Sequence, residues 1–239
     1  MDVASGAPRY SIIVATLNEE ATIESCIRRV LAVYPTQCEV LVINGGTDGT
    51  GAVVDAIAAT TPAVRHIRNP DDRGKGQAIR LGVAMARASI QAQIDADLQF
   101  LPEELPLVLD PVVRDEADVV LGSRFIGGST RWEGSTPRLR TMGNRAISAY
   151  ASLCFGLRMT DVQTGLKAWT ASAMRRIDLR SDNYSYEVEI AGKALMRGLR
   201  VREVPITTDA RRAGKSNVTV VSAGVALLRD IAMFRLGMK

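Results

Sequence analysis

Three oxygen-bearing side chains stand close together in the segment Gln93–Phe100, which reads QIDADLQF. Aspartate is a poor strand former and is costly to bury, so two aspartates directly after an apolar run indicate a binding role. If the segment is an extended strand, Asp95, Asp97 and Gln99 share one face because successive side chains alternate. Such hard oxygen ligands suit Mg²⁺ or Mn²⁺, which commonly bind a substrate's phosphates as well. A D-x-D pair also arises by chance, and Gln99 fits an exposed position equally well.

Two glycine-rich turns have the composition of anion-binding sites. GGTDGT (residues 45–50) and RGKGQA (residues 73–78) each stand between a strand-like and a helix-like segment. Glycine lets backbone N–H groups approach an anion at a helix N-terminus, and Lys75 adds a positive charge. Neither turn matches the G-x-G-x-x-G or G-x-x-x-x-G-K-[ST] pattern, so neither nucleotide-binding fingerprint is present. Ordinary tight turns are the alternative interpretation.

Basic residues gather at two places in the second half of the chain. Guanidinium groups bind phosphate oxygens in a bidentate way, so two clusters fit two phosphate groups. Surface arginines are often only solvated, and we select Arg124, Arg140 and Arg211 as functional. The first cluster is Arg124, Arg131, Arg138 and Arg140, and the second is Arg211, Arg212 and Lys215.

The order of the secondary-structure elements predicts how these residues are positioned. Strand-like runs alternate with segments of helical periodicity, as in Tyr10–Ala15 followed by a helix over residues 19–34 with Asn18 as its N-cap. Such alternation predicts an α/β fold with a mostly parallel central sheet flanked by helices. Ligands bind at the carboxyl ends of the strands in such sheets, where the candidate residues fall. The other expected strands are 38–43, 64–69, 90–94, 117–124 and 200–206, and the other expected helices are 52–60, 74–88, 141–157 and 218–236.

Length and composition narrow the class of protein. The 239 residues fit one domain, and 46% hydrophobic with 23% charged residues is typical of a folded globular protein. A net charge of +4 is compatible with an anionic substrate or membrane surface. Aromatic residues make up only 5% and are not interleaved with a basic stretch, so we expect no nucleic-acid binding. Three cysteines without C-x-x-C spacing predict reduced thiols in a cytoplasmic protein.

Several other site classes find no support. The longest uncharged, largely apolar run is Ala146–Leu157, which is shorter than the roughly 20 residues that a membrane-spanning helix needs. His66, the sole histidine, lies inside an expected strand, where a structural role is favoured. A single histidine excludes a histidine-rich zinc site, and a serine triad would have to use His66 itself.

Taken in order, nine segments resemble the family 2 inverting glycosyltransferases, and among them the enzymes that transfer mannose or glucose to dolichyl and polyprenyl phosphates. The resemblance extends from about Tyr10 to Ser216 in the order and spacing of that family. Each segment alone is a weak signal, but the nine together are specific for the superfamily. The segments are VATLNEE (14–20), VINGGTDGT (42–50), RGKGQA (73–78), DADLQF (95–100), LGSRF-IGG (121–128), PRLRTMGNR (137–145), TDVQTGLKAW (160–169), EVP (203–205) and RRAGKS (211–216).

The resemblance implies a GT-A fold for the whole chain as a single domain. The nucleotide-sugar-binding half would be about residues 8–126, and the acceptor-binding half about residues 127–239. The donor would be of the GDP-mannose or UDP-glucose type, and Mg²⁺ or Mn²⁺ on Asp95, Asp97 and Gln99 would bind its diphosphate. The implied donor-binding residues are Ala15, Leu17, Glu19, Asn44, Lys75 and Asp95, and the implied catalytic residues are Asp97, Arg211 and Asp161.

For the acceptor, the resemblance implies a polyprenyl or dolichyl phosphate bound by Arg124, Arg138 and Arg140. The second pKa of a phosphate monoester is near ~6, so this acceptor is largely ionised at pH 7 and needs no strong general base. A lipid acceptor implies peripheral contact with the cytoplasmic face of the membrane, through Ala146–Leu157 or Val218–Leu236. Both segments also fit core positions or the contacts of a homo-oligomer.

Other functions remain open at this point. A soluble hydroxyl acceptor would need a carboxylate base, for which the candidates are Asp161, Glu187 and Glu189. A non-catalytic nucleotide-sugar or lipid-phosphate-binding module is opposed by the intact metal-site aspartates and Arg211. A sugar-1-phosphate nucleotidyltransferase would carry a glycine-rich, arginine-bearing N-terminal turn, which is absent.

The chain departs from the family pattern at three places. Ala15 stands where the family has proline. The backbone is less rigid there, but no reactive group is lost. Ile43 and Asn44 replace the usual pair of aspartates before the second turn, and this leaves recognition of the nucleobase open. Asn217 stands where many relatives have lysine.

Overall fold

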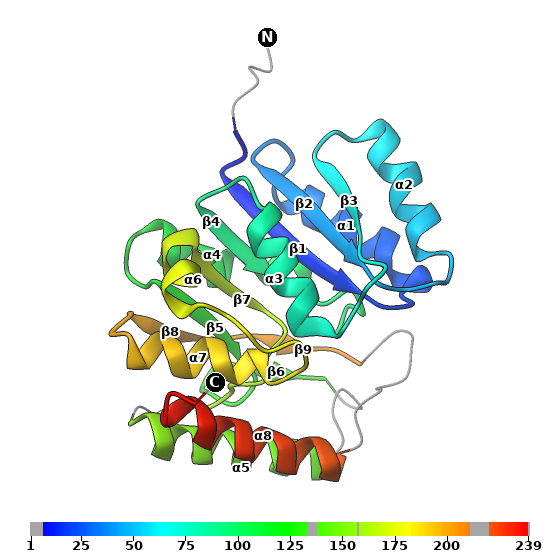
Figure 1. The fold of residues 1–239 in the computed structure, drawn as a ribbon. Helices are drawn as coiled ribbons and strands as arrows, with labels where there is room; N and C mark the ends of the chain where they lie inside the picture. The colour runs from blue at the N-terminus through cyan, green and yellow to red at the C-terminus, as the bar shows by residue number, and fades with distance from the viewer. Residues whose placement is uncertain (1–6, 133–137, 157, 211–219, 239) are drawn as a thin grey trace.

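The computed structural model describes residues 7–132, 138–156, 158–210 and 220–238, and its centre is a twisted β-sheet (Figure 1). In the described residues this sheet has seven strands in the order β3-β2-β1-β4-β7-β5-β8. Strand β7 is antiparallel to both of its neighbours, and the other neighbouring pairs are parallel. The strands are β1 (Tyr10–Thr16), β2 (Cys38–Asn44), β3 (Val64–Arg68), β4 (Ile90–Gln93), β5 (Val119–Ser123), β7 (Lys167–Thr170) and β8 (Val201–Pro205), and a separate parallel pair is β6 (Thr130–Arg131) with β9 (Thr207–Thr208).

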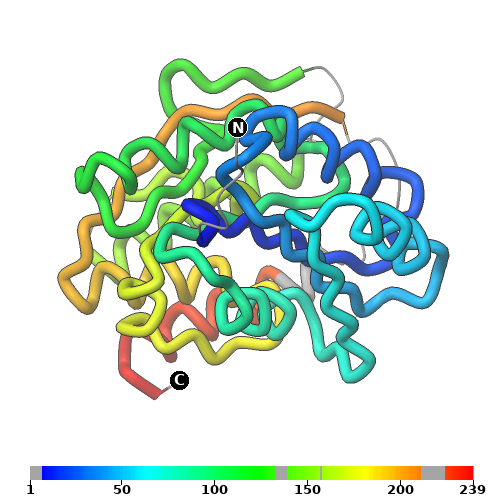
Figure 2. Tube along the Cα trace, turned by 90° about the horizontal axis from the view of Figure 1, so that it is seen from above, coloured from blue at the N-terminus to red at the C-terminus, as the bar shows by residue number. Residues whose placement is uncertain are grey.

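Helices cover both faces of the sheet (Figure 2). Helices α1, α2 and α4 share one buried apolar cluster with the sheet, while α3, α6 and α7 share the other. Helices α5 and α8 lie side by side beyond α7, on the underside of the molecule in Figure 1. Their bounds are α1 (Glu20–Val33), α2 (Thr50–Thr60), α3 (Lys75–Met85), α4 (Leu105–Val113), α5 (Arg138–Phe155), α6 (Ala171–Ile177), α7 (Tyr186–Met196) and α8 (Val220–Arg235), with a 3-10 turn at Pro102–Glu104.

The central strands are buried on both faces, which explains their nearly continuous apolar sequences. On β1, Ile12 and Val14 enter the cluster under α1, whereas Ile13 enters the cluster under α3. Strand β2 alternates in the same way, with Val42 on one side and Ile43 on the other. The expectation of a mostly parallel sheet flanked by helices is confirmed. None of the helices in the described part of the chain combines the length and hydrophobicity needed to cross a bilayer.

Two local expectations were wrong. Strand β4 ends at Gln93, and the following segment turns through Leu98, whose φ is +60°, so Asp95, Asp97 and Gln99 do not lie on one strand face. Asn18 does not cap α1: its own φ is +58°, and its Oδ1 accepts hydrogen bonds from the backbone N–H groups of Thr47 (3.0 Å) and Asp48 (3.3 Å). Asn18 therefore ties the loop after β1 to the loop after β2.

Strand β7 and helices α4, α6 and α7 were not expected from the sequence. Strand β7 has only four residues, and it places Lys167 and Trp169 inside the sheet, both with 0% exposure. It comes from the expected acceptor half and separates β4 from β5 in the donor half. The expected division of the chain near residue 127 stays a prediction.

A buried carboxylate holds α7 against the loop that precedes it. Glu189 is completely buried, and it accepts hydrogen bonds from the backbone N–H groups of Arg180 (2.9 Å) and Ser181 (2.8 Å). It also forms an ion pair with the buried Lys193 one turn later. Removing one partner of such a pair leaves the other charge buried without compensation.

We expect Glu189→Ala to lower the free energy of unfolding by about 3–5 kcal/mol, because Lys193 and two backbone donors lose their partner. Urea titration followed by circular dichroism measures this. The matched control is Glu24→Ala, which removes an exposed pair with Arg28 on α1 and should cost less than about 1 kcal/mol. Equal effects of the two substitutions would contradict this role for Glu189.

Candidate active site

A lysine ammonium lies against the first aspartate of the D-x-D segment. Lys75 is the first residue of α3, and its Nζ is 2.7 Å from Asp95 Oδ1 and 3.6 Å from Glu187 Oε1. Burial alone would lower the pKa of Lys75, but attraction by Asp95, Tyr186 and Glu187 raises it well above its ordinary value. Lys75 is therefore a permanent cation, and the helix start at Gly74 directs it toward the end of β4.

Gly165 is the residue that allows Asp95 this position. A Cβ atom at Gly165 would lie 2.2 Å from Asp95 Oδ2 and 2.4 Å from its carboxyl carbon, far inside van der Waals contact. The loop before β7 therefore packs directly on the carboxylate, and only a residue without a side chain fits. This contact joins the segment after β4 to the TDVQTGLKAW segment, about seventy residues later in the chain.

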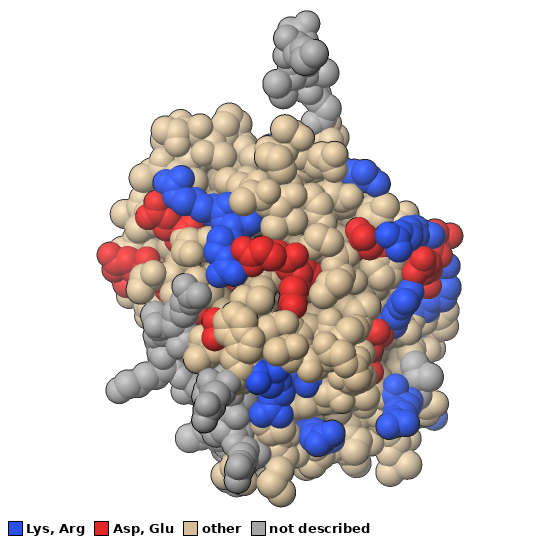
Figure 3. All heavy atoms as spheres, turned by 180° about the vertical axis from the view of Figure 1, so that it is seen from behind, with Lys and Arg blue, Asp and Glu red and all other residues tan. Residues whose placement is uncertain are grey.

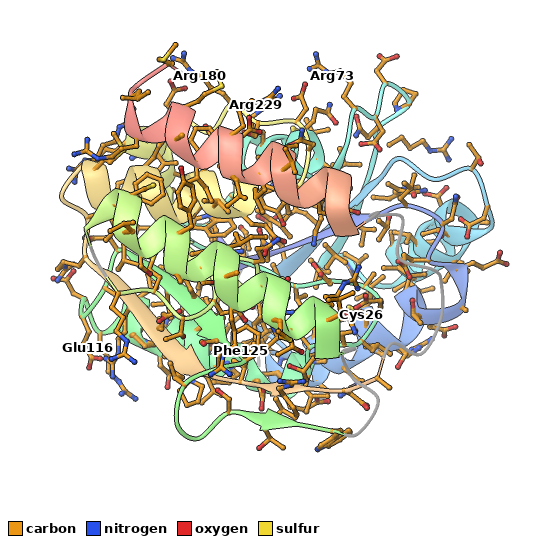
Figure 4. All side chains as sticks on the ribbon, turned by 90° about the horizontal axis from the view of Figure 1, so that it is seen from below. Cys26, Arg73, Glu116, Phe125, Arg180 and Arg229 are labelled. Carbon is orange, nitrogen blue, oxygen red and sulfur yellow. The ribbon has the colours of Figure 1, made fainter. Side chains whose placement is uncertain are left out.

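The second aspartate lies deeper than the first. Asp97 is 3% exposed, and its Oδ1 accepts a hydrogen bond from the backbone N–H of Gln99 at 3.1 Å. On α1, burial together with the charges of Asp97 and Asp95 raises the pKa of the Cys26 thiol to about 12. Both carboxylates therefore place negative charge near Cys26 of α1, the residue labelled in Figure 4.

These residues fit a divalent cation. Asp95 already binds a positive group, and Asp97 is a second hard oxygen donor two residues later. Among the described residues, no group of three or more histidine, cysteine, aspartate and glutamate side chains is arranged to hold a metal ion. A cation here would consequently depend on the two aspartates and on oxygens from outside the chain, such as phosphate and water.

The expected donor-binding residues come together at the carboxyl ends of β1 and β2. Asn44 is largely buried, and its Oδ1 accepts hydrogen bonds from Thr16 Oγ1 (3.2 Å) and Gly46 N (2.9 Å), so it shapes the glycine-rich turn. The backbone N–H of Glu19 donates to Thr50 Oγ1 at 2.9 Å. Ala15 lies next to the last residue of β1, and Leu17 directly follows the strand with its side chain 47% exposed.

Arg124 and Asp161 form a buried, bidentate ion pair. Arg124 Nε lies 2.6 Å from Asp161 Oδ2, and an Nη lies 2.8 Å from Oδ1. The same Nη donates to the backbone carbonyl of Gln163 at 2.9 Å. Asp161 is 0% exposed, and its backbone N–H donates to Glu203. The Asp161 carboxylate therefore holds the Arg124 guanidinium through Nε and one Nη, and the other Nη takes no part in these contacts. The catalytic role of Asp161 and the acceptor-binding role of Arg124 stay predictions.

Two further arginines stand beside Arg124: Arg131, which the sequence placed in the first basic cluster without selecting it as functional, and Arg145, which lay outside both clusters. The guanidinium carbons of Arg124, Arg131 and Arg145 lie 5.4, 5.9 and 5.5 Å from the centroid of the Phe125 ring. Within the described part of the chain, Arg131 and Arg145 have no carboxylate partner at ion-pair distance. Phe125 thus carries three guanidinium groups close together beneath α5 (Figure 4), a suitable site for an anion.

The structure describes the remaining predicted arginines only in part. Arg140 lies on α5 and is half-buried, whereas the side chain of Arg138 and the whole of Arg211 lie outside the described residues. Lys167 and Tyr186 were not predicted as site residues, and the Tyr186 ring lies close to the ammonium groups of both Lys75 and Lys167. The Nζ atoms of Lys75 and Lys167 are 5.9 and 5.8 Å from the Tyr186 ring centroid, and Gln93 donates to the Tyr186 hydroxyl at 3.0 Å.

Comparison with known proteins now decides the family. The family model described as "Glycosyl transferase family 2" matches residues 11–197. The chain belongs to glycosyl transferase family 2. This range extends from β1 to the residue after helix α7, and it includes Lys75, Asp95, Arg124 and Asp161.

Curated family 2 relatives align over most of the chain. Polyprenol monophosphomannose synthase of Mycolicibacterium smegmatis is 31% identical over 221 residues, which are 88% of this chain and 81% of the relative. Undecaprenyl-phosphate mannosyltransferase of Micrococcus luteus is 31% identical over 228 residues, 92% of this chain and 91% of the relative.

The fold is that of the GT-A glycosyltransferases. Glucosyl-3-phosphoglycerate synthase of Mycobacterium tuberculosis, solved with Mn²⁺, UDP and glucosyl-3-phosphoglycerate, superposes with a TM-score of 0.74. The superposition covers 99% of this chain and 82% of that one at 21% identity, so it shows the shared fold. The chain is thus a glycosyltransferase with the fold that its sequence predicts.

We expect Gly165→Ala to lower turnover at least about a hundredfold, because its Cβ must displace Asp95 by more than the 1 Å that commonly costs this much. Glycosyl transfer measured by product formation tests this, and thermal unfolding shows whether the variant is folded. The control is Gly143→Ala on α5, where an added Cβ meets nothing within 4 Å. Full activity of Gly165→Ala would show that the position of Asp95 does not matter.

Lys167 makes a testable contribution to stability as a function of pH. Burial lowers its pKa from 10.5 to about 8, although Glu187 attracts the charge. Between these values the unfolded chain binds a proton that the folded chain has lost, so the contribution of Lys167 to stability rises with pH. The unfolding free energy of the wild type minus that of Lys167→Met should increase by up to about 3 kcal/mol across this interval. Urea titrations at several pH values measure the difference, and a flat difference would contradict the lowered pKa.

Proposed function

We propose that this glycosyltransferase moves a hexose, mannose or glucose, from a nucleoside-diphosphate sugar to a polyprenyl phosphate with inversion at the sugar carbon. The observation that carries the proposal is the state of the candidate general bases. Asp161 and Glu189 are 0% exposed and engaged in buried ion pairs, and Glu187 faces Lys75. An acceptor that is already ionised needs none of them. The two curated relatives named above are a polyprenol-phosphate and an undecaprenyl-phosphate mannosyl enzyme by name, which supports the same acceptor class.

On the donor side, we propose that Asp95 and Asp97 hold Mg²⁺ or Mn²⁺. The structural neighbour solved with Mn²⁺ and UDP supports a divalent cation in this fold. When bound, the cation would neutralise charge on the diphosphate as it leaves. Lys75 stands at the N-terminus of α3 beside Asp95, where its ammonium and the helix end both favour the same diphosphate. The loop from Ala15 to Glu19 and the turn shaped by Asn44 bind the nucleoside.

On the acceptor side, Arg131 and Arg145 receive the phosphate above Phe125, together with the remaining Nη of Arg124. The pair with Asp161 fixes the plane of the Arg124 guanidinium. This Nη is therefore already oriented before the acceptor phosphate binds. The acceptor phosphate keeps its charge because three cations surround it, and the anionic oxygen attacks the sugar carbon opposite the leaving group.

A soluble acceptor that carries both a hydroxyl and a phosphate is the second candidate. Glucosyl-3-phosphoglycerate synthase, whose fold matches with a TM-score of 0.74, is named for such a product. The same arginine cluster could bind the phosphate of 3-phosphoglycerate. In that case a hydroxyl would be the nucleophile, and Glu187 would have to leave Lys75 to act as its base.

The test compares acceptors under otherwise identical conditions. Purified protein is incubated with GDP-mannose or UDP-glucose and Mg²⁺ or Mn²⁺, and with undecaprenyl phosphate, undecaprenol or 3-phosphoglycerate in detergent. We expect transfer to undecaprenyl phosphate, loss of transfer with chelator, and none to undecaprenol because it lacks the charge that the arginines bind. Thin-layer chromatography of the radiolabelled product measures transfer. Transfer to 3-phosphoglycerate alone would overturn the proposal in favour of the second candidate.

The variant Arg145→Ala tests the proposed acceptor site in the same assay. Losing one charge-assisted hydrogen bond should raise KM for undecaprenyl phosphate about tenfold or more, while donor binding by thermal shift is unchanged. The matched control is Arg28→Ala, which removes an exposed arginine of α1 that pairs only with Glu24 on its own helix.

A further inference from the structure

The most exposed large hydrophobic side chains of the described residues gather on helices α5 and α8 and the residues just after α8. Six such side chains are at least 66% exposed, whereas no other large hydrophobic side chain in the described part exceeds 48%. Helices α5 and α8 lie side by side across the underside of the molecule (Figure 4), so these six form one region, named here the α5/α8 surface. They are Leu139 (72%), Met142 (68%), Leu153 (80%), Val225 (66%), Leu236 (71%) and Met238 (67%).

On α5 the exposed side chains form a continuous apolar stripe. Leu139, Met142, Ala146, Ala149 and Leu153 are all exposed, and their spacing of three and four residues places them on one side of the helix. The opposite side of α5 is the one that packs, as the complete burial of Ala151 in the core cluster shows. A helix that presents apolar residues outward as well as inward has a second partner besides its own core.

The charges around the stripe are positive. The α5 sequence contains three arginines and no carboxylate. The α8 sequence contains Arg229, Arg235 and one carboxylate, Asp230, which is 1% exposed and accepts a hydrogen bond from Ser185 Oγ at 2.6 Å. In the view from behind, the charged side chains lowest on the molecule are all basic (Figure 3). The α5/α8 surface therefore combines exposed apolar side chains and arginines without an exposed carboxylate from either helix.

This surface is continuous with the proposed acceptor site. Arg145 extends from α5 to the Phe125 ring, and Arg131 donates a hydrogen bond to Thr141 Oγ1 of α5 at 3.1 Å. An acceptor phosphate held by these arginines leaves its hydrocarbon chain at the start of the apolar stripe. An apolar stripe bordered by cations is the composition of a helix that lies in the plane of an anionic membrane surface.

We propose that the α5/α8 surface docks on an anionic lipid bilayer, with both helices parallel to the membrane plane and Leu139, Met142 and Leu153 inserted among the headgroups. The proposal rests on the proposed function in one respect, which is that a polyprenyl acceptor is presented from such a bilayer. The inserted side chains bring the arginine cluster at Phe125 to the level of the lipid phosphates.

Vesicle co-sedimentation tests the docking. Wild-type protein should bind vesicles of phosphatidylcholine with phosphatidylglycerol more strongly than vesicles of phosphatidylcholine alone, and added salt should weaken the binding. The double variant Met142→Glu with Leu153→Glu should bind the anionic vesicles at least about tenfold more weakly, because it places two carboxylates in the stripe. Leu107→Glu on α4, where Leu107 is 43% exposed on another surface, is the matched control and should bind like the wild type. Equal binding by the double variant and the control would overturn the proposal.

Two further measurements separate the alternatives. If light scattering shows a wild-type dimer that the double variant converts to a monomer, and the wild type does not bind vesicles, a second copy covers the surface and docking is wrong. Transfer to a short-chain, water-soluble prenyl phosphate should be unchanged in the double variant, as the α5/α8 surface is not needed for a dissolved acceptor. Vesicle binding by a wild type that transfers to no prenyl phosphate would overturn the proposed function and leave the docking intact.

Discussion

The site depends on the control of negative charge where β4 ends. Two carboxylates stand within three residues of each other in a largely buried turn, a placement that costs free energy unless cations compensate it. Lys75 supplies part of that compensation from the N-terminus of α3, and the close packing of Gly165 keeps Asp95 in reach of it. Burial is the main cause of the raised pKa of the Cys26 thiol on α1, and the charges of Asp97 and Asp95 contribute to it. In the proposed function, a divalent cation bound with the donor would compensate the rest of this negative charge.

The second half of the site uses a carboxylate in the opposite way. Asp161 is buried so that it can hold an arginine, and Glu203 in turn holds the backbone around Asp161. In this structure the Asp161 carboxylate is engaged by Arg124, and its catalytic role stays a prediction. In the function proposed above, the carboxylates would serve the donor end of the site and the guanidinium groups the acceptor end.

Helices α5 and α8 connect this chemistry to the surroundings of the molecule. Arg145 belongs to the arginine cluster at Phe125 and to the helix that exposes an apolar stripe, so the proposed acceptor binding and the proposed membrane contact share one element. Since both helices pack on the far side of α7, they can meet a surface without disturbing the sheet that holds the donor-binding loops.

The sequence by itself determined the alternating α/β architecture, since strands buried on both faces must be apolar runs and the helices between them must be amphipathic. It also determined that Asn44 lies at a strand end and that Lys75, Asp95 and Asp97 come after strand ends, because that relation is local. The tertiary structure alone decided that β7 enters the sheet between β4 and β5, as four residues with a buried lysine carry no recognisable period. The same long-range packing paired Asp161 with Arg124 and gathered Arg131 and Arg145 on Phe125. Those contacts join residues that are distant in sequence, and charge type alone does not say which carboxylate neutralises which arginine.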